Sequence, residues 1–287
     1  MNEIRAVGVL GFGTMGAGIV QIAAAAGHPV VVYEPHPEGL DRGWQRLTAF
    51  LDNGIARGKS TAAQRDALLA RVRRTTELTD LRDVDLVIEA AVEQKALKQE
   101  LLASVARIVN ADAVIATNTS ALSVTELAAD LPEAGRVAGL HFFNPAPVMA
   151  LVEVVRAVQT SDATVERLMA WATAAGNHPI EVKDRPGFLV NAIFMPYIND
   201  VVQAYDDGLA SAQDIDVALR LGLGYPMGPL ELLDLIGLDT HHHATSAAYA
   251  DTLDPRYSPP PLLTRLVQAG WTGNKSGRGI RSLEEHA

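Results

Sequence analysis

The sequence contains no cysteine, which excludes disulfides, thiolate nucleophiles and thiolate metal ligands. A chain without cysteine fits a reducing compartment, so we expect a cytoplasmic protein. Long hydrophobic runs are also missing, since none reaches the roughly 18 residues that span a bilayer. The segment MNEIRAVGVL passes from a short polar lead into a strand-like run and lacks the pattern of an export signal. We therefore expect no membrane span.

Positive charge is scarce as well. Lys and Arg number 24 against 34 Asp and Glu, which gives a formal net charge of -10. Nucleic acid and anionic membranes attract basic surfaces, so neither is an expected partner. With 287 residues and 48% hydrophobic content, the chain can bury a large core, as one large domain or as two of moderate size.

Short apolar runs alternate with longer helical patterns in the first part of the chain. The expected strands are 4–10, 29–33, 84–90, 113–118, 136–142, 151–155 and 178–182. Such alternation, with nearly continuous apolar strands, is typical of a parallel sheet covered on both faces, the α/β Rossmann-type doubly wound fold. After KDRPG the strand patterns almost vanish. We predict an α/β domain over residues 1–183 and an all-helical domain over residues 184–287.

The motif GFGTMG follows the first expected strand and opens a helix. Gly11 allows a tight turn, Gly13 lets a pyrophosphate approach the backbone, and Gly16 lets helix and strand pack closely. Glu34 ends the second strand, where a carboxylate binds the hydroxyls of an adenosine ribose and repels a 2′-phosphate. The alternative is a plain turn followed by a surface glutamate. We predict that the first domain binds NAD rather than NADP.

Two other motifs have weaker interpretations. GIARGKST at 54–61 resembles a phosphate-binding loop, but only three residues separate Gly54 from Gly58 and the preceding stretch looks helical. The three consecutive histidines at 241–243 cannot converge on one ion, because neighbouring helical side chains point about 100° apart. We expect no metal site and assign the histidines a structural or interface role.

The segment GLHFFNPAPVMALVEVV carries one imidazole and one carboxylate between apolar runs. Burial of either group without a partner is costly, so His141 and Glu153 are expected to be partners, brought together by antiparallel or neighbouring strand ends. A carboxylate that fixes the imidazole tautomer makes it a general base. Asn118 and Ser120 fall at the carboxyl ends of the strands, where such sheets bind ligands. The plainer alternatives are a hydrogen-bonded core histidine and a rim carboxylate.

Six segments resemble, in order, the signatures of the L-3-hydroxyacyl-CoA dehydrogenases, particularly the short bacterial 3-hydroxybutyryl-CoA members. They are GFGTMGAGI, EAAVEQKALKQEL, TNTSALSVTELA, GLHFFNPAPVMALVEVV, DRPGFLVN and GLGYPMGPLELLDLIGLDT. The resemblance covers nearly the whole chain. It implies NAD-dependent oxidation of a short-chain (3S)-hydroxyacyl-CoA to the 3-ketoacyl-CoA, or the reverse reaction, by a homodimer joined through the helical domain.

The resemblance also implies roles by position. His141 matches the family's catalytic base and Glu153 its partner, while Ser120 and Asn191 match residues that hydrogen-bond the reacting oxygen and the thioester region. Asn191 follows the expected domain boundary, so the helical domain would complete the cleft. The plainer alternatives are a helix cap for Ser120 and a helix-terminal hydrogen bond for Asn191. The positions that match the cofactor lining are Glu93, Lys98 and Asn118.

The chain departs from the family pattern at several positions. Ala150 and Ala192 replace a common lysine and a common arginine, and GRGIRSL replaces an aromatic-rich tail. These changes leave the acyl carrier and the chain length open. Arg57, with Lys59 nearby, is an expected contact for the phosphates of coenzyme A. The alternative for both is a solvated cationic face.

Three rival functions remain open at this point. The β-hydroxyacid dehydrogenases also begin with glycine-rich turns, but they need a lysine four residues after the asparagine, where this chain has Met195. The same fold could oxidise another 3-hydroxy compound, such as a sugar acid or a hydroxyacyl group on a carrier protein, which Ala150 and Ala192 would favour. A non-catalytic NAD-binding relative would not need all four proposed catalytic residues.

Overall fold

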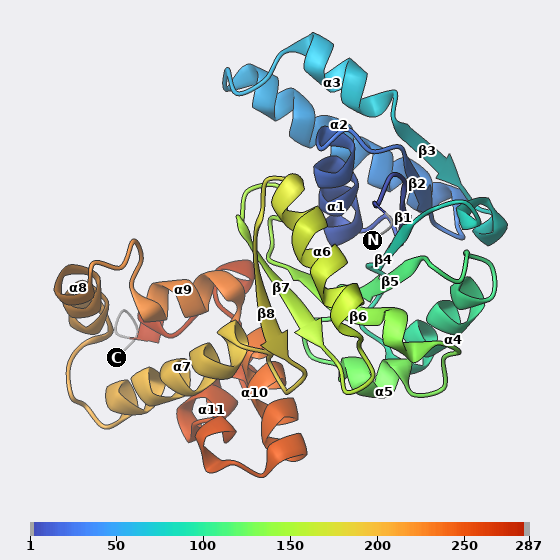
Figure 1. Cartoon of the computed structure of the whole chain (residues 1–287). Coiled ribbons are helices and arrows are strands. Elements are labelled where there is room, and N and C mark those ends of the chain that lie inside the picture. Colours follow the sequence, from blue (N-terminus) through green and yellow to red (C-terminus); the bar gives the residue numbers. More distant parts are fainter. Residues whose placement is uncertain (1–2, 284–287) are drawn as a thin grey trace. The chain divides into compact units, whose positions relative to one another are not determined.

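The computed structural model describes residues 3–283, and the chain forms two compact units, Met1–Asp184 and Arg185–Ala287. The first unit contains an eight-stranded sheet in the order β3-β2-β1-β4-β5-β6-β7-β8 (Figure 1). The strands are β1 Val7–Leu10, β2 Val30–Tyr33, β3 Val72–Thr75, β4 Leu86–Glu89, β5 Val114–Thr117, β6 Val137–Phe142, β7 Leu151–Arg156 and β8 His178–Lys183. The first six follow the strand order of dinucleotide-binding sheets. The prediction of a Rossmann-type doubly wound sheet is confirmed.

Helices cover both faces of this sheet because its strands are apolar on both sides. Along β1, Val9 packs into the core beneath α1, α2 and α6, while Leu10 packs into the core beneath α4 and α5. In Figure 1, α2 and α3 lie side by side next to α1. The helices of this unit are α1 Thr14–Ala25, α2 Pro37–Ala56, α3 Ala62–Leu69, η1 Leu78–Leu81, α4 Lys95–Ala106, α5 Val124–Ala128, η2 Ala134–Arg136 and α6 Asp162–Ala174.

The edge strand β3 was not predicted from the sequence. Its residues VRRT form no apolar run, because two arginines point to the surface. Arg73 pairs with Asp80 at 2.6 Å, and the guanidinium of Arg74 lies 4.6 Å from the ring centre of Trp44. Charged side chains on an edge strand also discourage pairing with another sheet.

One neighbouring pair of strands departs from the parallel pattern. Strand β7 runs antiparallel to β6, whereas all the other pairs in the sheet are parallel. The connection through residues 143–150 is too short for the crossover that parallel neighbours require, which takes about a dozen residues or more. The antiparallel register places His141 directly opposite Glu153.

The second unit consists of helices around a separate apolar core. This core includes Ile198, Val202, Leu230 and Leu233. Its helices are α7 Val190–Asp206, α8 Ala212–Leu223, α9 Pro229–Ile236, α10 Leu238–Thr252, η3 Pro255–Tyr257, α11 Pro261–Gln268, η4 Asn274–Ser276 and η5 Arg281–Leu283. The prediction of a helical C-terminal region is confirmed. Across residues 3–283, no helix has the length and apolar character needed to cross a membrane.

Candidate active site

The glycine motif forms an open cradle at the end of β1. Gly11 has a φ of +93°, which favours glycine, and a Cβ on Gly16 would overlap the carbonyl oxygen of Gly11. A Cβ on Gly13 would meet nothing within 4 Å, so this position faces open space. Gly13 is also the N-cap of α1 and supplies no capping side chain. The backbone N–H groups of the first turn are therefore suited to a phosphate.

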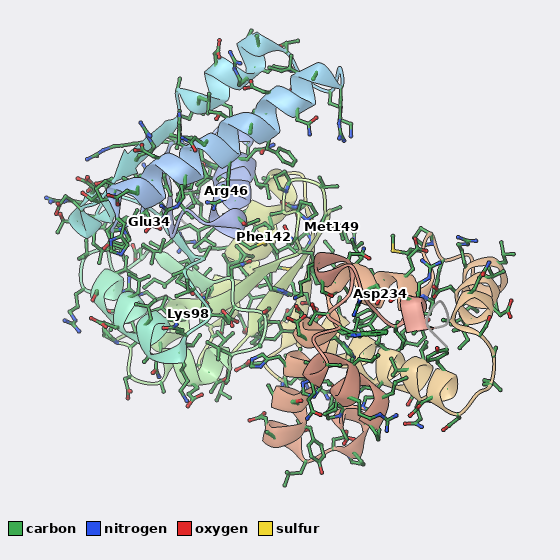
Figure 2. The ribbon with its side chains drawn as sticks, turned by 180° about the vertical axis from the view of Figure 1, so that it is seen from behind. Glu34, Arg46, Lys98, Phe142, Met149 and Asp234 are labelled. Carbon is green, nitrogen blue, oxygen red and sulfur yellow. The ribbon has the colours of Figure 1, made fainter. Side chains whose placement is uncertain are left out.

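Glu34 is held beside this cradle. The N–H of Phe12 donates to Glu34 Oε2 at an N···O distance of 3.3 Å. Helix α2 passes directly behind the carboxylate, because a Cβ on Gly39 would lie 2.6–2.7 Å from Glu34 atoms. Gly39 therefore provides the space in which the carboxylate lies, and Glu34 is labelled in Figure 2.

A cavity of about 690 Å³ opens between the cradle and the loop after β4. Its polar wall includes Gly13 and Glu34, and its apolar wall includes Leu78, Val92 and Leu101. An open backbone cradle, a carboxylate beside it and an apolar slot are suited to the diphosphate, ribose and adenine of a dinucleotide. The residues present fit NAD.

Lys98 lies on α4 and was predicted to line the cofactor (Figure 2). Its side chain is buried, and its ammonium donates to both oxygens of Glu89 at 2.7 and 2.9 Å. The same ammonium lies 3.2 Å from Glu93 Oε2, and Thr117 Oγ1 donates to Glu89 Oε2 at 2.6 Å. Lys98 is thus enclosed between two carboxylates at the carboxyl end of β4.

Glu93 connects this buried cluster to Ser120. Its Oε1 accepts hydrogen bonds from Thr119 Oγ1 at 2.5 Å, from the N–H of Ser120 at 3.0 Å and from the N–H of Ala121 at 3.3 Å. Burial alone would raise its pKa, but the bond from Thr119, the Lys98 charge and the Ser120 N–H together hold the pKa of Glu93 below its usual value. The backbone of Ser120 is fixed while its side chain stays exposed.

His141 and Glu153 form the second buried polar pair of this unit. His141 Nδ1 lies 2.7 Å from Glu153 Oε2, the imidazole is 5% exposed and the carboxylate residue 0%. An ionised carboxylate only accepts hydrogen bonds, so Nδ1 carries the proton and the lone pair of the neutral ring lies on Nε2. Antiparallel pairing supplies the geometry that the sequence analysis expected. The arrangement suits a general base.

Asn118 ties the end of β5 to the end of β6 beside this pair. Its Oδ1 accepts the N–H of Phe142 at 2.9 Å, and its own N–H donates to the carbonyl of Glu89 at 2.7 Å. The strand ends that carry the Lys98 cluster and His141 are therefore linked by direct hydrogen bonds.

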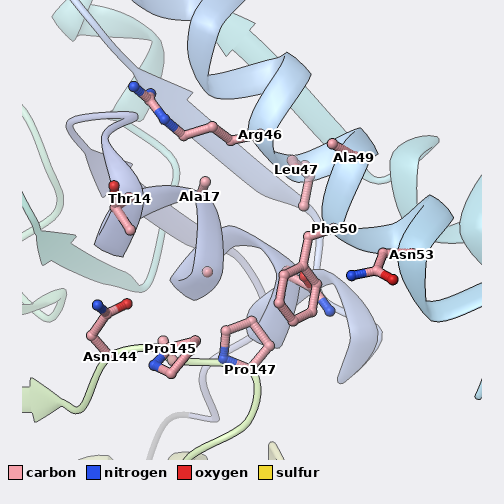
Figure 3. A pocket seen from close by; sticks show the side chains of 13 residues that line it. Thr14, Ala17, Arg46, Leu47, Ala49, Phe50, Asn53, Asn144, Pro145 and Pro147 are labelled. Atoms are coloured by element: carbon pink, nitrogen blue, oxygen red, sulfur yellow. The ribbon is translucent and has the colours of Figure 1, made fainter. Parts of the chain in front are cut away.

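A groove of about 420 Å³ begins three residues after His141 and runs along α2. The ring of Phe50 faces Pro147, and Arg46 and Asn53 lie elsewhere along the same helix (Figure 3). This groove was not predicted from the sequence. Phe50 is 38% exposed although it lies beside the buried residues Leu47 and Leu51 of α2, and this large aromatic side chain near the apolar face of the helix was the signal available. The lining residues are Thr14, Ala17, Gly18, Gln21, Arg46, Leu47, Ala49, Phe50, Asn53, Asn144, Pro145, Ala146 and Pro147.

The remaining predicted residues lie outside these clusters. Arg57 is the exposed C-cap of α2, and Lys59 follows it on the surface. Asn191 belongs to the second unit, where it is the second residue of α7 and is half-buried.

Comparison with protein families decides which family this geometry belongs to. The model for the 3-hydroxyacyl-CoA dehydrogenase NAD binding domain matches residues 6–185, and the model for the C-terminal domain of the same proteins matches residues 187–282. The chain belongs to the 3-hydroxyacyl-CoA dehydrogenase family. The predicted family and the predicted cofactor, NAD, are confirmed, and the chain is an NAD-dependent oxidoreductase.

Individual relatives of this 3-hydroxyacyl-CoA dehydrogenase match over nearly its whole length. The 3-hydroxybutyryl-CoA dehydrogenase of Mycobacterium tuberculosis is 44% identical over 281 residues, which cover 97% of this chain and 98% of that protein. The crystal structure of (S)-3-hydroxybutyryl-CoA dehydrogenase from Ralstonia eutropha has a TM-score of 0.94 and 43% identity, covering 97% of this chain and 98% of that chain. The 3-hydroxyadipyl-CoA dehydrogenase of Escherichia coli is 41% identical, over 98% of this chain and 59% of that protein.

Proposed function

We propose that this enzyme oxidises a short-chain (3S)-hydroxyacyl-CoA, 3-hydroxybutyryl-CoA, to the 3-ketoacyl-CoA with NAD, and runs the reverse reaction with NADH. The observation that carries the proposal is the buried His141–Glu153 pair, with an Nδ1···Oε2 distance of 2.7 Å, near the carboxyl end of β6 in a sheet that also presents the glycine cradle. The names of the relatives from Mycobacterium tuberculosis and Ralstonia eutropha support the short acyl chain.

Bound NAD supplies the hydride acceptor. His141 acts as the general base and takes the hydroxyl proton of the substrate on Nε2, because the bond from Nδ1 to Glu153 leaves the basic lone pair there. Glu153 stabilises the imidazolium that forms. In the reverse direction the same imidazolium returns the proton to the carbonyl oxygen.

Ser120 and Asn191 orient the substrate. The Ser120 hydroxyl donates to the reacting oxygen, and the hydrogen bonds that Glu93 accepts from the backbone of residues 120 and 121 limit the movement of that hydroxyl. The Asn191 amide donates to the acyl group. Each added hydrogen bond narrows the range of orientations that the alcohol can take while the proton leaves.

The groove along α2 accommodates the arm of the coenzyme A thioester. Its apolar floor at Phe50 and Pro147 suits an aliphatic chain, and its polar side chains Arg46 and Asn53 suit amide groups. Arg57 at the end of α2 then pairs with the phosphates. The groove starts beside the segment that leaves His141, so a thioester lying in it would bring its acyl end toward the imidazole.

The second unit mediates formation of a homodimer. Its described surface exposes large apolar side chains on and around α8 and α9, and such groups are usual where a subunit interface forms. They are Leu221, Leu223, Tyr225, Leu235 and Ile236. Sedimentation equilibrium of the wild type and of Leu223→Glu measures the association. A wild type that sediments as a monomer at micromolar concentration contradicts the dimer.

The function is tested by following NADH absorbance with acetoacetyl-CoA, longer 3-ketoacyl-CoA thioesters, 3-oxoadipyl-CoA and the free acids as separate substrates. We expect acetoacetyl-CoA to have the highest kcat/KM and the free acids to be poor substrates. His141→Ala should remove turnover while NAD binding survives, and His178→Ala, at an exposed histidine, is the matched control. A higher kcat/KM for 3-oxoadipyl-CoA than for acetoacetyl-CoA would contradict the proposed short acyl chain. Turnover that survives His141→Ala would show that His141 is not the base.

A further inference from the structure

The first turn of α7 lacks one of its backbone hydrogen bonds. In an α-helix the carbonyl of residue i accepts the N–H of residue i+4. Ala192 is followed four residues later by Pro196, which lies inside α7 and has no N–H. The Ala192 carbonyl therefore needs a donor from outside the helix backbone.

Tyr257 supplies that donor. Its hydroxyl donates to the Ala192 carbonyl at 3.0 Å, and Arg185 donates to the same hydroxyl at 3.4 Å. Tyr257 is 1% exposed, and its ring packs against Met195 and Ala248. The phenol thus takes the place of the missing N–H at the turn that carries Asn191.

The segment that carries Tyr257 is itself held rigidly. Thr245 Oγ1 donates to the Tyr257 carbonyl at 2.7 Å, and Asn199 Nδ2 donates to the carbonyls of Arg256 at 3.1 Å and Ser258 at 3.4 Å. Asn199 lies on α7, two turns after the residue that receives the phenol. The segment is therefore bonded to the same helix at two levels, so its hydroxyl has little freedom to move away.

The segment that leads into this turn is also closely packed against it. A Cβ on Gly187, whose φ is +74°, would lie 2.8 Å from the Ala192 nitrogen and 2.8 Å from Met195 Cε. Phe188 follows with a φ of +51° and is buried. The chain therefore enters α7 through a tight turn that packs against the helix, and Tyr257 bonds to the same turn.

We infer that Tyr257 is a positioning residue for Asn191: its hydroxyl replaces the hydrogen-bond donor that Pro196 cannot supply and fixes the turn from which the Asn191 amide reaches the substrate. The inference rests on the proposed role of Asn191. It explains why the buried phenol of Tyr257 lies against the turn of α7 that precedes Pro196: residue 196 has no N–H, so the Ala192 carbonyl accepts the phenol hydroxyl instead.

Tyr257→Phe tests the inference because it removes only the hydroxyl. We expect kcat with acetoacetyl-CoA and NADH to fall about tenfold, the effect of losing one hydrogen bond of ordinary strength. The KM for NADH should be unchanged. Tyr249→Phe, on a partly exposed tyrosine of α10, is the matched control for loss of a phenol and should keep the wild-type kcat.

Restoring the missing donor should rescue the variant. Pro196→Ala gives residue 196 an N–H within reach of the Ala192 carbonyl, so Tyr257→Phe/Pro196→Ala should recover most of the lost kcat. A role in stability alone predicts a lower Tm with normal kcat for Tyr257→Phe, and that result overturns the inference. If Tyr257→Phe does not fold, the double variant is compared with Pro196→Ala, and a large loss of kcat in the double variant likewise overturns it.

A cycle with Asn191→Ala separates this inference from the proposed function. If Tyr257 acts through Asn191, Tyr257→Phe should have no further effect on kcat in the Asn191→Ala background. Additive losses overturn the positioning role and leave the proposed function standing. Normal turnover by Asn191→Ala alone removes the proposed role of Asn191, and the inference falls with it.

Discussion

The buried imidazole of His241 makes the stability of the second unit depend on pH. His241 lies on α10, is 4% exposed, and its Nε2 is 3.0 Å from Asn199 Oδ1. Burial, reinforced by the neighbouring charge of His242, lowers the pKa of His241 from 6.5 to about 4. The folded protein therefore keeps this ring neutral at pH values where the unfolded chain takes up a proton.

The sign and size of the effect follow from this difference in pKa. Because the unfolded chain binds the extra proton below pH 6.5, the contribution of His241 to the free energy of unfolding is complete above pH 6.5. It is lost progressively as the pH falls from 6.5 to about 4. At 1.36 kcal/mol per pKa unit, the loss is about 3 kcal/mol.

Denaturant unfolding of the wild type and of His241→Gln between pH 7 and pH 4 measures the contribution of His241 to the free energy of unfolding. Glutamine places an amide near the position of Nε2, so the variant can still donate to Asn199 but cannot titrate. The wild type should lose about 3 kcal/mol more stability than His241→Gln over this range. His178→Gln, at an exposed position, should follow the wild type. Parallel pH curves for the wild type and His241→Gln would refute the reasoning.

Three further substitutions test the first unit. Glu153→Gln allows an amide to donate to His141 Nδ1 and stabilise the wrong tautomer, so kcat should fall about 10²- to 10⁴-fold; near-normal kcat would show that the carboxylate is dispensable. Gly39→Ala places a Cβ within 2.7 Å of Glu34 atoms, so the KM for NAD should rise about fivefold as the ribose bonds weaken, and an unchanged KM would contradict this. Arg57→Ala should raise the KM for acetoacetyl-CoA about fivefold but leave that for acetoacetyl-pantetheine unchanged, and equal effects on both would exclude a phosphate contact.

Local patterns were sufficient to predict the glycine turn after β1 and the His141–Glu153 pair. The spacing of the glycines was enough to predict the motif, because the backbone conformation or the close packing at Gly11 and Gly16 favours a residue without a side chain. The imidazole and the carboxylate interrupt continuous apolar runs, and burial obliges such groups to find partners. The direction of β7 follows from the length of its connection, and antiparallel pairing was one of the two arrangements expected from the sequence for this pair.

The interior position of Lys98 could not be read from its own helix. In KALKQEL a lysine looks like part of a solvated face, and only its long-range contact with Glu89 explains its burial. The one local signal was Glu89 itself, a carboxylate within an apolar strand. Tyr257 was missed for a related reason, since the acceptor that it meets is created by a proline 61 positions earlier.

The buried Lys98–Glu89 and His141–Glu153 pairs occupy one region of the sheet, and this position argues for a role in orienting groups rather than in stability. Glu89 ends β4, and His141 lies one residue from the end of β6, with Asn118 bonded to both strand ends. Removing charged groups from water costs several kcal/mol per ion, and apolar replacements of such pairs are often as stable. Apolar side chains fill the rest of these strands, so the fold does not need charge there. The charged groups instead orient their neighbours through directional hydrogen bonds. Lys98 holds Glu93, which accepts the N–H of Ser120. Glu153 holds the imidazole of His141.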